Sequence, residues 1–253
     1  MDANMETNER NFRITIEYDG TAYHGWQRQK DRRSIQGEIE KALKKLTSQK
    51  VTLIGSGRTD AGVHALGQIA NFRCQTRMSA QAFEKGLNSL LPEDIVICGC
   101  REVDESFHAR YDAVGKRYRY CILNRPTPAA VGRQYAWYLK KPLDVAAMES
   151  AASRILGKHD FKAFEGTGSP RSHTIRTVVE AKWRKAASGL LVFEIEADGF
   201  LRFMVRNIVG SLVDVGQGKK TPDDFEAILN ARDRSLAGIT APPQGLFLLR
   251  VKY

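Results

Sequence analysis

Hydrophobic and polar residues alternate in several short stretches of the chain, a pattern that predicts β-strands. In the first of these, Phe12, Ile14, Ile16 and Tyr18 occupy every second position, and polar or charged residues lie between them. Because successive side chains of a strand point to opposite faces, this spacing predicts a half-buried strand. Further strands are expected at 51–55, 67–73, 95–103, 117–123, 178–185, 190–197 and 245–253.

Between these strands, apolar residues recur at helical spacing. Ile35, Ile39, Leu43 and Leu46 follow Ser34, whose hydroxyl can accept a hydrogen bond from the first helical turn. Further helices are expected at 79–90, 143–156 and 202–215, and a short one after Thr221, where Pro222 and Asp224 suit a capping box.

Strands and helices are mixed in both halves of the chain, which predicts an α+β fold with two lobes. Each lobe is expected to hold a mixed, mostly antiparallel sheet with helices on one face. The boundary is expected near 104–112, which assigns residues 1–106 to one lobe and 107–253 to the other. A length of 253 residues is sufficient for two such cores. We expect a basic cleft between the lobes.

The charge balance changes this picture by indicating a polyanionic partner. The chain has 39 Lys and Arg against 29 Asp and Glu, a net charge of +10. Such a surplus raises the affinity for nucleic acid, although a merely soluble basic surface is equally consistent with it. The first ten residues lack the features of a signal peptide, and no window reaches the roughly 18 apolar residues of a membrane span. We therefore expect a cytoplasmic protein with no membrane partner.

The cysteines and histidines do not indicate a metal site. The four cysteines form no C-x-x-C pair, and the five histidines have no ligand spacing. Cys98 and Cys100 alternate in an apolar run, so both are expected on one face of a strand as buried thiols. We predict no metal, no disulfide and no cofactor.

The most unusual stretch of the chain is the glycine-rich segment from Gly55 to His64, GSGRTDAGVH. Glycines let the backbone approach a bulky ligand, and loops between strands present functional groups. An Asp followed two positions later by a Gly, as in Asp60 and Gly62, is also common in turns. By itself this pair indicates a structural turn. Arg58 and His64 beside it, in a basic chain, favour a functional loop.

This segment and its continuation, GRTDAGVHALGQIANF, resemble the signature of the tRNA pseudouridine synthase A family. Other segments resemble the family in the same order, and together they extend from residue 14 to 253: DGTAYHGWQRQ, SIQGEIEKAL, FHARYDAVGKRYRY, GFLRFMVRNIVGSLVDVGQGK and AGITAPPQGLFLLRVKY. The resemblance implies an isomerase that converts uridine to pseudouridine at positions 38, 39 and 40 of the tRNA anticodon stem-loop. It also implies a homodimer whose two subunits both contact the tRNA.

The resemblance also implies roles for three of the candidate residues. Asp60 matches the catalytic nucleophile, and Arg206 matches the arginine that pairs with it. Tyr118 matches the residue stacked on the target uracil and is a candidate to assist proton removal from C5. We assign Arg58, the other possible partner of Asp60, and His64 to substrate binding together with Tyr118.

The chemistry of the reaction agrees with this set of residues. The N1–C1′ bond breaks, the base turns, and C5 joins C1′, so no atom or electron is gained and one carboxylate suffices. Burial would raise the pKa of Asp60 and a neighbouring arginine would lower it. Arg206 lies among apolar residues, where a charge needs a partner. Whether Asp60 attacks the sugar C1′ or the base C6 stays open.

Tyr118 lies in the alternating sequence KRYRY. A core aromatic is the ordinary interpretation in a sheet. Stacking on a flipped base is the functional one, and Lys116, Arg117 and Arg119 are expected to surround the ring as RNA-binding neighbours. Two other functions compete with the isomerase: a non-catalytic RNA-binding protein, and a nucleoside or glycoside hydrolase, which would need a second acid or base.

Overall fold

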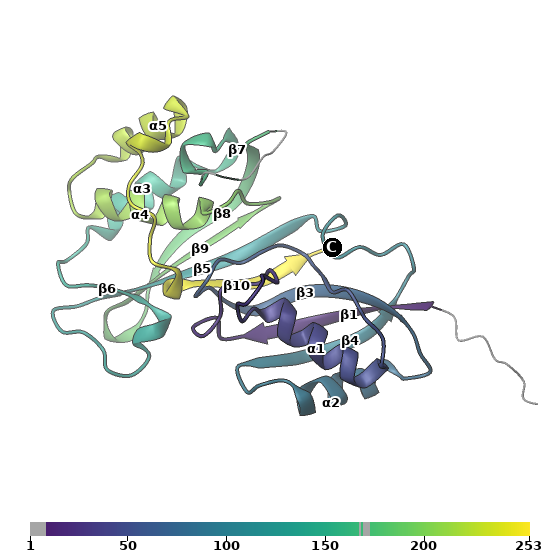
Figure 1. Cartoon of the computed structure of the whole chain (residues 1–253). Coiled ribbons are helices and arrows are strands. Elements are labelled where there is room, and N and C mark those ends of the chain that lie inside the picture. The colour runs from purple at the N-terminus through teal and green to yellow at the C-terminus, as the bar shows by residue number, and fades with distance from the viewer. Residues whose placement is uncertain (1–8, 167, 169–172) are drawn as a thin grey trace, which may run out of the picture. The chain divides into compact units, whose positions relative to one another are not determined.

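The computed structural model describes residues 9–166, 168 and 173–253, and the chain divides into two compact units (Figure 1). The first unit comprises the residues up to Ala113 together with Tyr253, and the second comprises Val114–Lys252. The division falls after Ala113, whereas the sequence placed a boundary between residues 106 and 107. Both units combine antiparallel strands with helices, which confirms the predicted α+β class.

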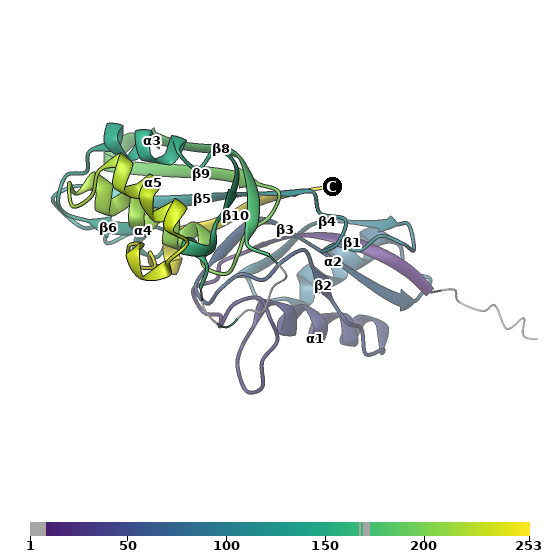
Figure 2. The same cartoon turned by 90° about the horizontal axis from the view of Figure 1, so that it is seen from above.

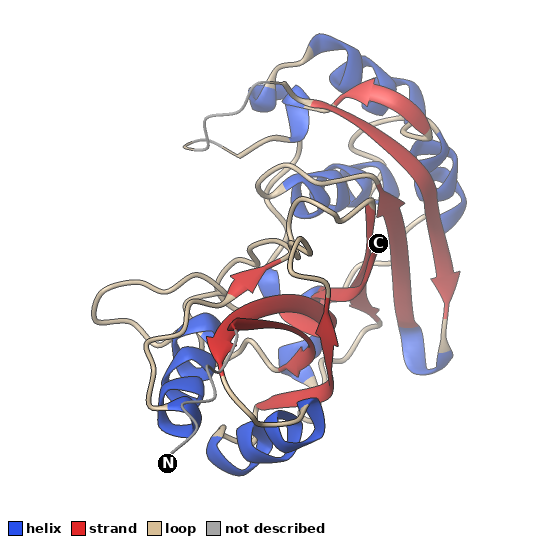
Figure 3. Ribbon diagram, turned by 90° about the vertical axis from the view of Figure 1, so that its right-hand side faces the viewer, coloured by secondary structure: helices blue, strands red, loops and turns tan. Residues whose placement is uncertain are grey.

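The first unit is built on a sheet with the order β4–β1–β3, and the short β2 pairs with β3. All of these pairs are antiparallel. The strands are β1 (Glu9–Tyr18), β2 (Ile54–Gly55), β3 (His64–Gln75) and β4 (Ile95–Val103). The helices are α1 (Ile35–Thr47) and α2 (Ala80–Leu90). Figure 3 shows both helices on the same side of this sheet.

Three phenylalanines fix the register of the first sheet. Phe12 and Phe72 are direct cross-strand partners, and their ring centroids are 5.5 Å apart. Phe83 of α2 packs on both, at 4.8 Å from Phe12 and 5.2 Å from Phe72. All three side chains are fully buried. Because a slip of one residue would turn these rings to the other face, the cluster determines how β1 pairs with β3.

The second unit contains a sheet with the order β10–β5–β9–β8–β7, and β6 runs parallel to β5. Its strands are β5 (Gly115–Asn124), β6 (Trp137–Leu139), β7 (Gly157–Asp160), β8 (Ile175–Lys185), β9 (Leu190–Ala197) and β10 (Leu246–Lys252). Its helices are α3 (Val145–Ser153), α4 (Met204–Gly216) and α5 (Pro222–Ala231), which lie together in Figure 2. Short 3-10 helices occupy Arg133–Tyr135, Lys162–Phe164, Ala187–Gly189, Arg234–Leu236 and Pro243–Gly245.

Local signals in the sequence predicted several boundaries correctly. The Ser34 hydroxyl accepts a hydrogen bond from the Gly37 N–H at 3.3 Å and begins α1. Thr221 and Asp224 form the expected capping box, with hydrogen bonds of 3.1 and 2.8 Å. The strand expected at 51–55 is shorter, because the Leu53 N–H donates to the Glu40 carboxylate at 3.1 Å instead of pairing in a sheet.

The prediction of buried thiols was wrong for Cys98. Its neighbours Ile95 and Ile97 are buried, and alternation turns Cys98 to the solvent side of β4, where it is exposed. Cys100 is partly buried, and burial raises the pKa of its thiol to about 12. Cys74 and Cys121 are buried as free thiols.

The second sheet has an apolar face and a charged face. Tyr118 and Tyr120 are buried on one, and Arg117 and Arg119 project to the other because side chains alternate along β5. There both arginines donate to Glu194, with closest distances of 2.6 Å from Arg117 and 2.9 Å from Arg119. The expectation that these arginines surround Tyr118 was therefore wrong, and they hold β5 to β9.

Replacement of Glu194 should test this network through its pH dependence. Burial alone would raise the pKa of Glu194, but hydrogen bonds from Arg119 and Arg117 outweigh it and lower the pKa. We expect Glu194→Gln to reduce the free energy of unfolding near neutral pH by roughly 1–3 kcal/mol, because Arg119 loses its carboxylate partner and Arg117 keeps only Glu180 and Glu196.

Because the folded-state pKa is depressed, the stabilisation is complete above the ordinary carboxyl pKa and is lost as pH falls through the folded value. The difference between wild type and variant should therefore shrink below about pH 4.3. Urea unfolding at several pH values measures it, with the exposed Glu93→Gln as control. A pH-independent difference would contradict the assignment.

Candidate functional site

The segment between β2 and β3 is anchored at its start by buried polar side chains. The Ser56 N–H donates to the Ile69 carbonyl at 2.8 Å, and its hydroxyl donates to the Gln68 side chain at 2.6 Å. The Gln68 amide in turn donates to the Gly57 carbonyl at 3.0 Å. Ser56 and Gln68 are almost fully buried. The loop therefore leaves the sheet at a fixed position.

Asp60 is the first residue of a tight turn. The Val63 N–H donates to the Asp60 carbonyl at 3.2 Å, and Gly62 has φ +75° while Ala61 does not have a positive φ. This combination defines a type II turn, in which glycine is required at the third position. The turn expected from the Asp-x-Gly pattern is therefore present, and it holds a partly exposed Asp60.

Thr59, the residue before the turn, is held by a side chain of β1. The Thr59 hydroxyl lies 2.7 Å from the Tyr18 hydroxyl, at the end of β1. Burial raises the pKa of Tyr18 far above its ordinary value, so the phenol stays protonated and available for this hydrogen bond. Thr59 is buried, whereas its neighbour Arg58 is exposed and Asp60 is partly exposed.

The loop between β1 and α1 lies directly on the Asp60 turn. The Trp26 N–H donates to the Thr59 carbonyl at 3.1 Å, and the Gly62 N–H donates to the Tyr23 carbonyl at 3.3 Å. Gly25 has φ +90°, and a Cβ there would lie 2.6 Å from the Thr59 oxygen. A glycine is thus needed both for the backbone conformation and for the close approach of the two loops.

His64 joins the same two loops at the start of β3. Its Nδ1 accepts a hydrogen bond from the Gly20 N–H at 3.1 Å and lies 3.0 Å from a carboxylate oxygen of Asp19. His64 is 1% exposed. These contacts give His64 a positioning role, and the predicted contact with substrate stays a prediction.

Tyr118 and Arg206 belong to the second unit. Tyr118 is on the apolar face of β5, where its ring meets Phe200 edge to face at a centroid distance of 5.0 Å and an angle of 82°. Arg206 is in the first turn of α4 and donates through Nε to the Ala241 carbonyl at 2.7 Å. Its guanidinium lies 5.1 Å from the ring centroid of Phe203, the residue that precedes the helix.

Sequence reasoning missed the residues that support the Asp60 turn. Tyr18 was assigned to a buried strand face, but nothing in its spacing indicated a bond to Thr59. Gln68 was a polar residue among apolar ones in a predicted strand, which was the available signal, and the structure shows that it is buried. Gly25 stands between His24 and Trp26 without a recognisable turn pattern.

No group of three His, Cys, Asp or Glu side chains that could hold a metal ion is found in residues 9–166, 168 and 173–253. In the same part of the chain, every helix is too short or too polar to cross a membrane.

The chain is similar to known proteins along almost its whole length. A family model described as tRNA pseudouridine synthase matches residues 14–112 and 151–253. A tRNA pseudouridine synthase A of Thermoanaerobacter sp. (strain X514) is 50% identical over 244 residues, which cover 96% of this chain and 100% of that protein. The protein of the same description from Acetivibrio thermocellus is 48% identical over the same shares.

Among solved structures, a Cbf5-Nop10-Gar1 complex aligns with 93% of this chain and 57% of that chain at 11% identity and a TM-score of 0.37. This similarity is too low to support a conclusion about the site.

Gly25→Ala should test whether the two loops depend on their close approach. The variant combines a strained φ with a collision against the Thr59 carbonyl, so we expect a loss of roughly 3 kcal/mol or more in stability. Gly132→Ala is the matched control, because Gly132 has φ +73° but open space around it, and it should lose roughly 1 kcal/mol. Thermal unfolding measures both, and equal losses would show that the approach of the loops is unimportant.

Proposed function

Since the family model and the curated relatives match nearly the whole chain, this protein belongs to the tRNA pseudouridine synthase family, and we propose that it isomerises uridines 38, 39 and 40 of the tRNA anticodon stem-loop with Asp60 as nucleophile. Members of this family are isomerases that act on tRNA uridine. The net charge of +10 supports binding of a polyanion of this kind.

The observation that carries the assignment of Asp60 is the rigidity of its turn. Thr59 and Val63 on either side are buried, and backbone hydrogen bonds reach the turn from the β1–α1 loop. The Asp60 side chain is the partly exposed group in this fixed frame. A nucleophile held this way loses little orientational freedom when the substrate binds, which favours attack.

The reaction can then proceed without a change in oxidation state. In one route, the Asp60 carboxylate attacks C1′, and uracil leaves with the electron pair of the N1–C1′ bond. The base turns, C5 attacks C1′ and displaces Asp60, and C5 then loses its proton while N1 gains one. In the other route, the carboxylate first adds to C6; the N1–C1′ bond breaks and the C5–C1′ bond forms as before, and the C6–O bond to Asp60 then breaks as C5 loses its proton. Both routes release the C5 proton.

Arg206 is proposed to pair with the Asp60 carboxylate. The N-terminus of α4 carries a positive partial charge, and the first turn of the helix contains Arg206 but no acidic residue. A cation in that position is unfavourable unless an anion is near. A carboxylate that must stay ionised would satisfy both the guanidinium and the helix end, and the pair would lower the pKa of the acid.

Tyr118 is proposed to stack on the target uracil and to assist removal of the C5 proton. The edge-to-face contact with Phe200 fixes the orientation of its ring, which suits recognition of a flipped base. Extrusion of that base costs a few kcal/mol, and contacts to RNA must offset this cost. The exposed Arg58, two residues before Asp60, is proposed to bind RNA. We further propose a cytoplasmic homodimer in which both subunits contact the tRNA.

Asp60→Asn should abolish isomerisation and preserve tRNA binding. The amide is nearly isosteric with the carboxylate but is a poor nucleophile, so the rate should fall by at least roughly 10⁴-fold. Tritium release from tRNA labelled at uracil C5 measures the rate, and filter binding measures the affinity. Glu105→Gln, which removes an exposed carboxylate elsewhere in the first unit, is the control. Substantial release by Asp60→Asn would refute the nucleophile.

Tyr118→Phe should separate the hydroxyl from the ring. The ring and its contact with Phe200 remain, so tRNA affinity should be unchanged. Loss of the hydroxyl should lower the single-turnover rate by roughly 10²–10⁴-fold if it takes part in proton transfer. A wild-type rate in the same tritium assay would restrict Tyr118 to stacking.

A further inference from the structure

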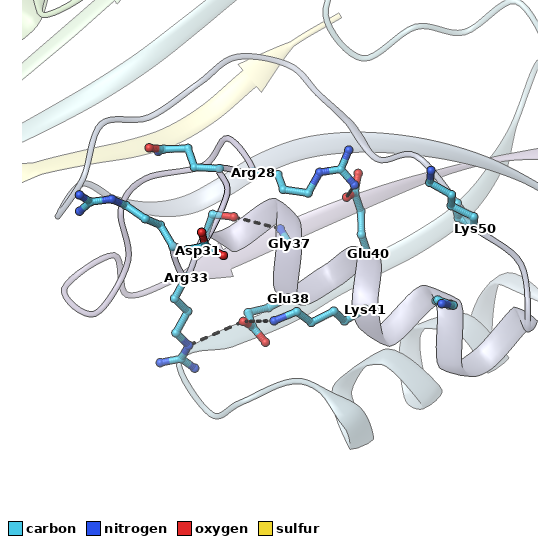
Figure 4. Close-up of a pocket in the computed structure, with 13 residues that line it drawn as sticks. Arg28, Asp31, Arg33, Gly37, Glu38, Glu40, Lys41 and Lys50 are labelled. Atoms are coloured by element: carbon cyan, nitrogen blue, oxygen red, sulfur yellow. Dashed lines mark hydrogen bonds and ion pairs between the residues drawn. The ribbon is translucent and has the colours of Figure 1, made fainter.

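A groove lined mainly by charged residues runs along α1, on the side where the preceding loop folds back over the helix (Figure 4). Its volume is about 690 Å³. Six basic side chains line it: Arg28, Arg32, Arg33, Lys41, Lys44 and Lys50. Three acidic residues, Asp31, Glu38 and Glu40, also line it, so the groove carries a surplus of three positive charges.

Two of the acidic residues are committed to neighbouring cations. Arg28 donates to Glu40 at 2.8 Å, and Lys41 donates to Glu38 at 3.1 Å, as Figure 4 shows for the second pair. Glu40 is also held by the backbone N–H of Leu53 at 3.1 Å, so it is part of the fold. These acids therefore compensate cations within the groove and leave the surplus on the remaining basic side chains.

Of the other four cations, Arg33 lies 3.9 Å from Glu38 and 3.7 Å from Asp94, which leaves Arg32, Lys44 and Lys50 to carry the surplus. All three are exposed, and within the described ranges of the chain their side chains make no hydrogen bond or ion pair. Lys44 near the C-terminal end of α1 is favoured by the helix dipole, which is a purely structural explanation for it. That explanation does not extend to Arg32, which precedes the N-terminus of the helix, or to Lys50, which follows its end.

The groove is connected to the Asp60 turn by a few residues of one loop. Trp26 donates its N–H to Thr59 on the side of the turn, and its carbonyl accepts from the Gln36 N–H of α1 at 3.0 Å. Two residues later, the Arg28 N–H donates to the Gln36 side chain at 2.9 Å, and Arg28 lines the groove. Both sites belong to the first unit, so the groove has a defined position relative to Asp60.

We propose that this groove binds the phosphate backbone of the tRNA substrate, over several nucleotides beyond the uridine at Asp60. The proposal rests on the proposed function, which supplies the polyanion. The 13 residues of α1 extend about 20 Å, longer than one flipped nucleotide requires. A row of cations on flexible side chains suits phosphates rather than base edges, so the groove adds affinity and orientation without reading sequence.

The test compares two triple variants with the same change in charge. Arg32→Ala, Lys44→Ala and Lys50→Ala together remove the surplus of the groove. Arg77→Ala, Lys85→Ala and Arg101→Ala together remove three exposed cations of the first unit outside it. The dissociation constant of an unmodified tRNA transcript is measured for both against salt concentration.

We expect the groove variant to bind tRNA roughly 10- to 100-fold more weakly at 0.15 M salt, and its log–log salt slope to decrease by about 2–3. The control should bind within about twofold of wild type. A charge-retaining variant, Arg32→Lys with Lys44→Arg and Lys50→Arg, should keep wild-type affinity, which separates lost charge from a folding defect.

Equal affinities and salt slopes for the two alanine variants would overturn the proposal. So would a weakened charge-retaining variant, because it would show that shape and not phosphate charge is recognised. Binding is measured without turnover, so this result is distinguishable from a failure of the isomerase assignment, which tritium release by the wild type decides.

Discussion

The proposed chemistry depends on one constraint: a single carboxylate must be held at a fixed position and remain reachable. The structure meets the positional part of this constraint through backbone contacts. Tyr18 holds Thr59 from β1, Gln68 holds Gly57 from β3, and the β1–α1 loop covers the other side at Trp26. The phenylalanine cluster of the first unit determines the register of β1 and β3, so the Asp60 turn is ultimately positioned by the hydrophobic core.

The features that could be predicted from the sequence are those that local physics determines. Ser34 and Thr221 cap helices through residues three positions away, and the alternation around Phe12 follows from the strand itself. The family and the identity of the candidate nucleophile could also be inferred, because the segment GRTDAGVH is contiguous. The site roles themselves remain proposals.

Other features depend on partners distant in sequence and could not be predicted. The partners of Arg117 and Arg119 are determined by the register of β5 with β9, and the short β2 results from the Glu40 carboxylate taking the Leu53 N–H. β7 has the polar sequence GKHD and no alternation, so its pairing with β8 left no pattern to detect. His64 could be read as a ligand-facing residue until its burial between two loops was known.

The basic residues show why net charge alone is a weak guide to function. Arg117 and Arg119 have the same formal charge as Arg32 and Lys44, but they are engaged by Glu194 and stabilise a sheet. The cations along α1 face an open groove, and part of their charge is not compensated. Their position along the helix that follows the loop on the Asp60 turn, rather than their number, connects them with a long anionic substrate.

The most direct test of the central claim is nucleoside analysis of tRNA after incubation with the protein. The tRNA is digested to nucleosides, and uridine, pseudouridine and free uracil are separated by chromatography. The account predicts that pseudouridine appears in the amount that uridine is lost, at positions 38–40, with no uracil released. Free uracil would show a hydrolase, and unchanged uridine in tRNA that the protein binds would show an RNA-binding protein; either result would contradict the account.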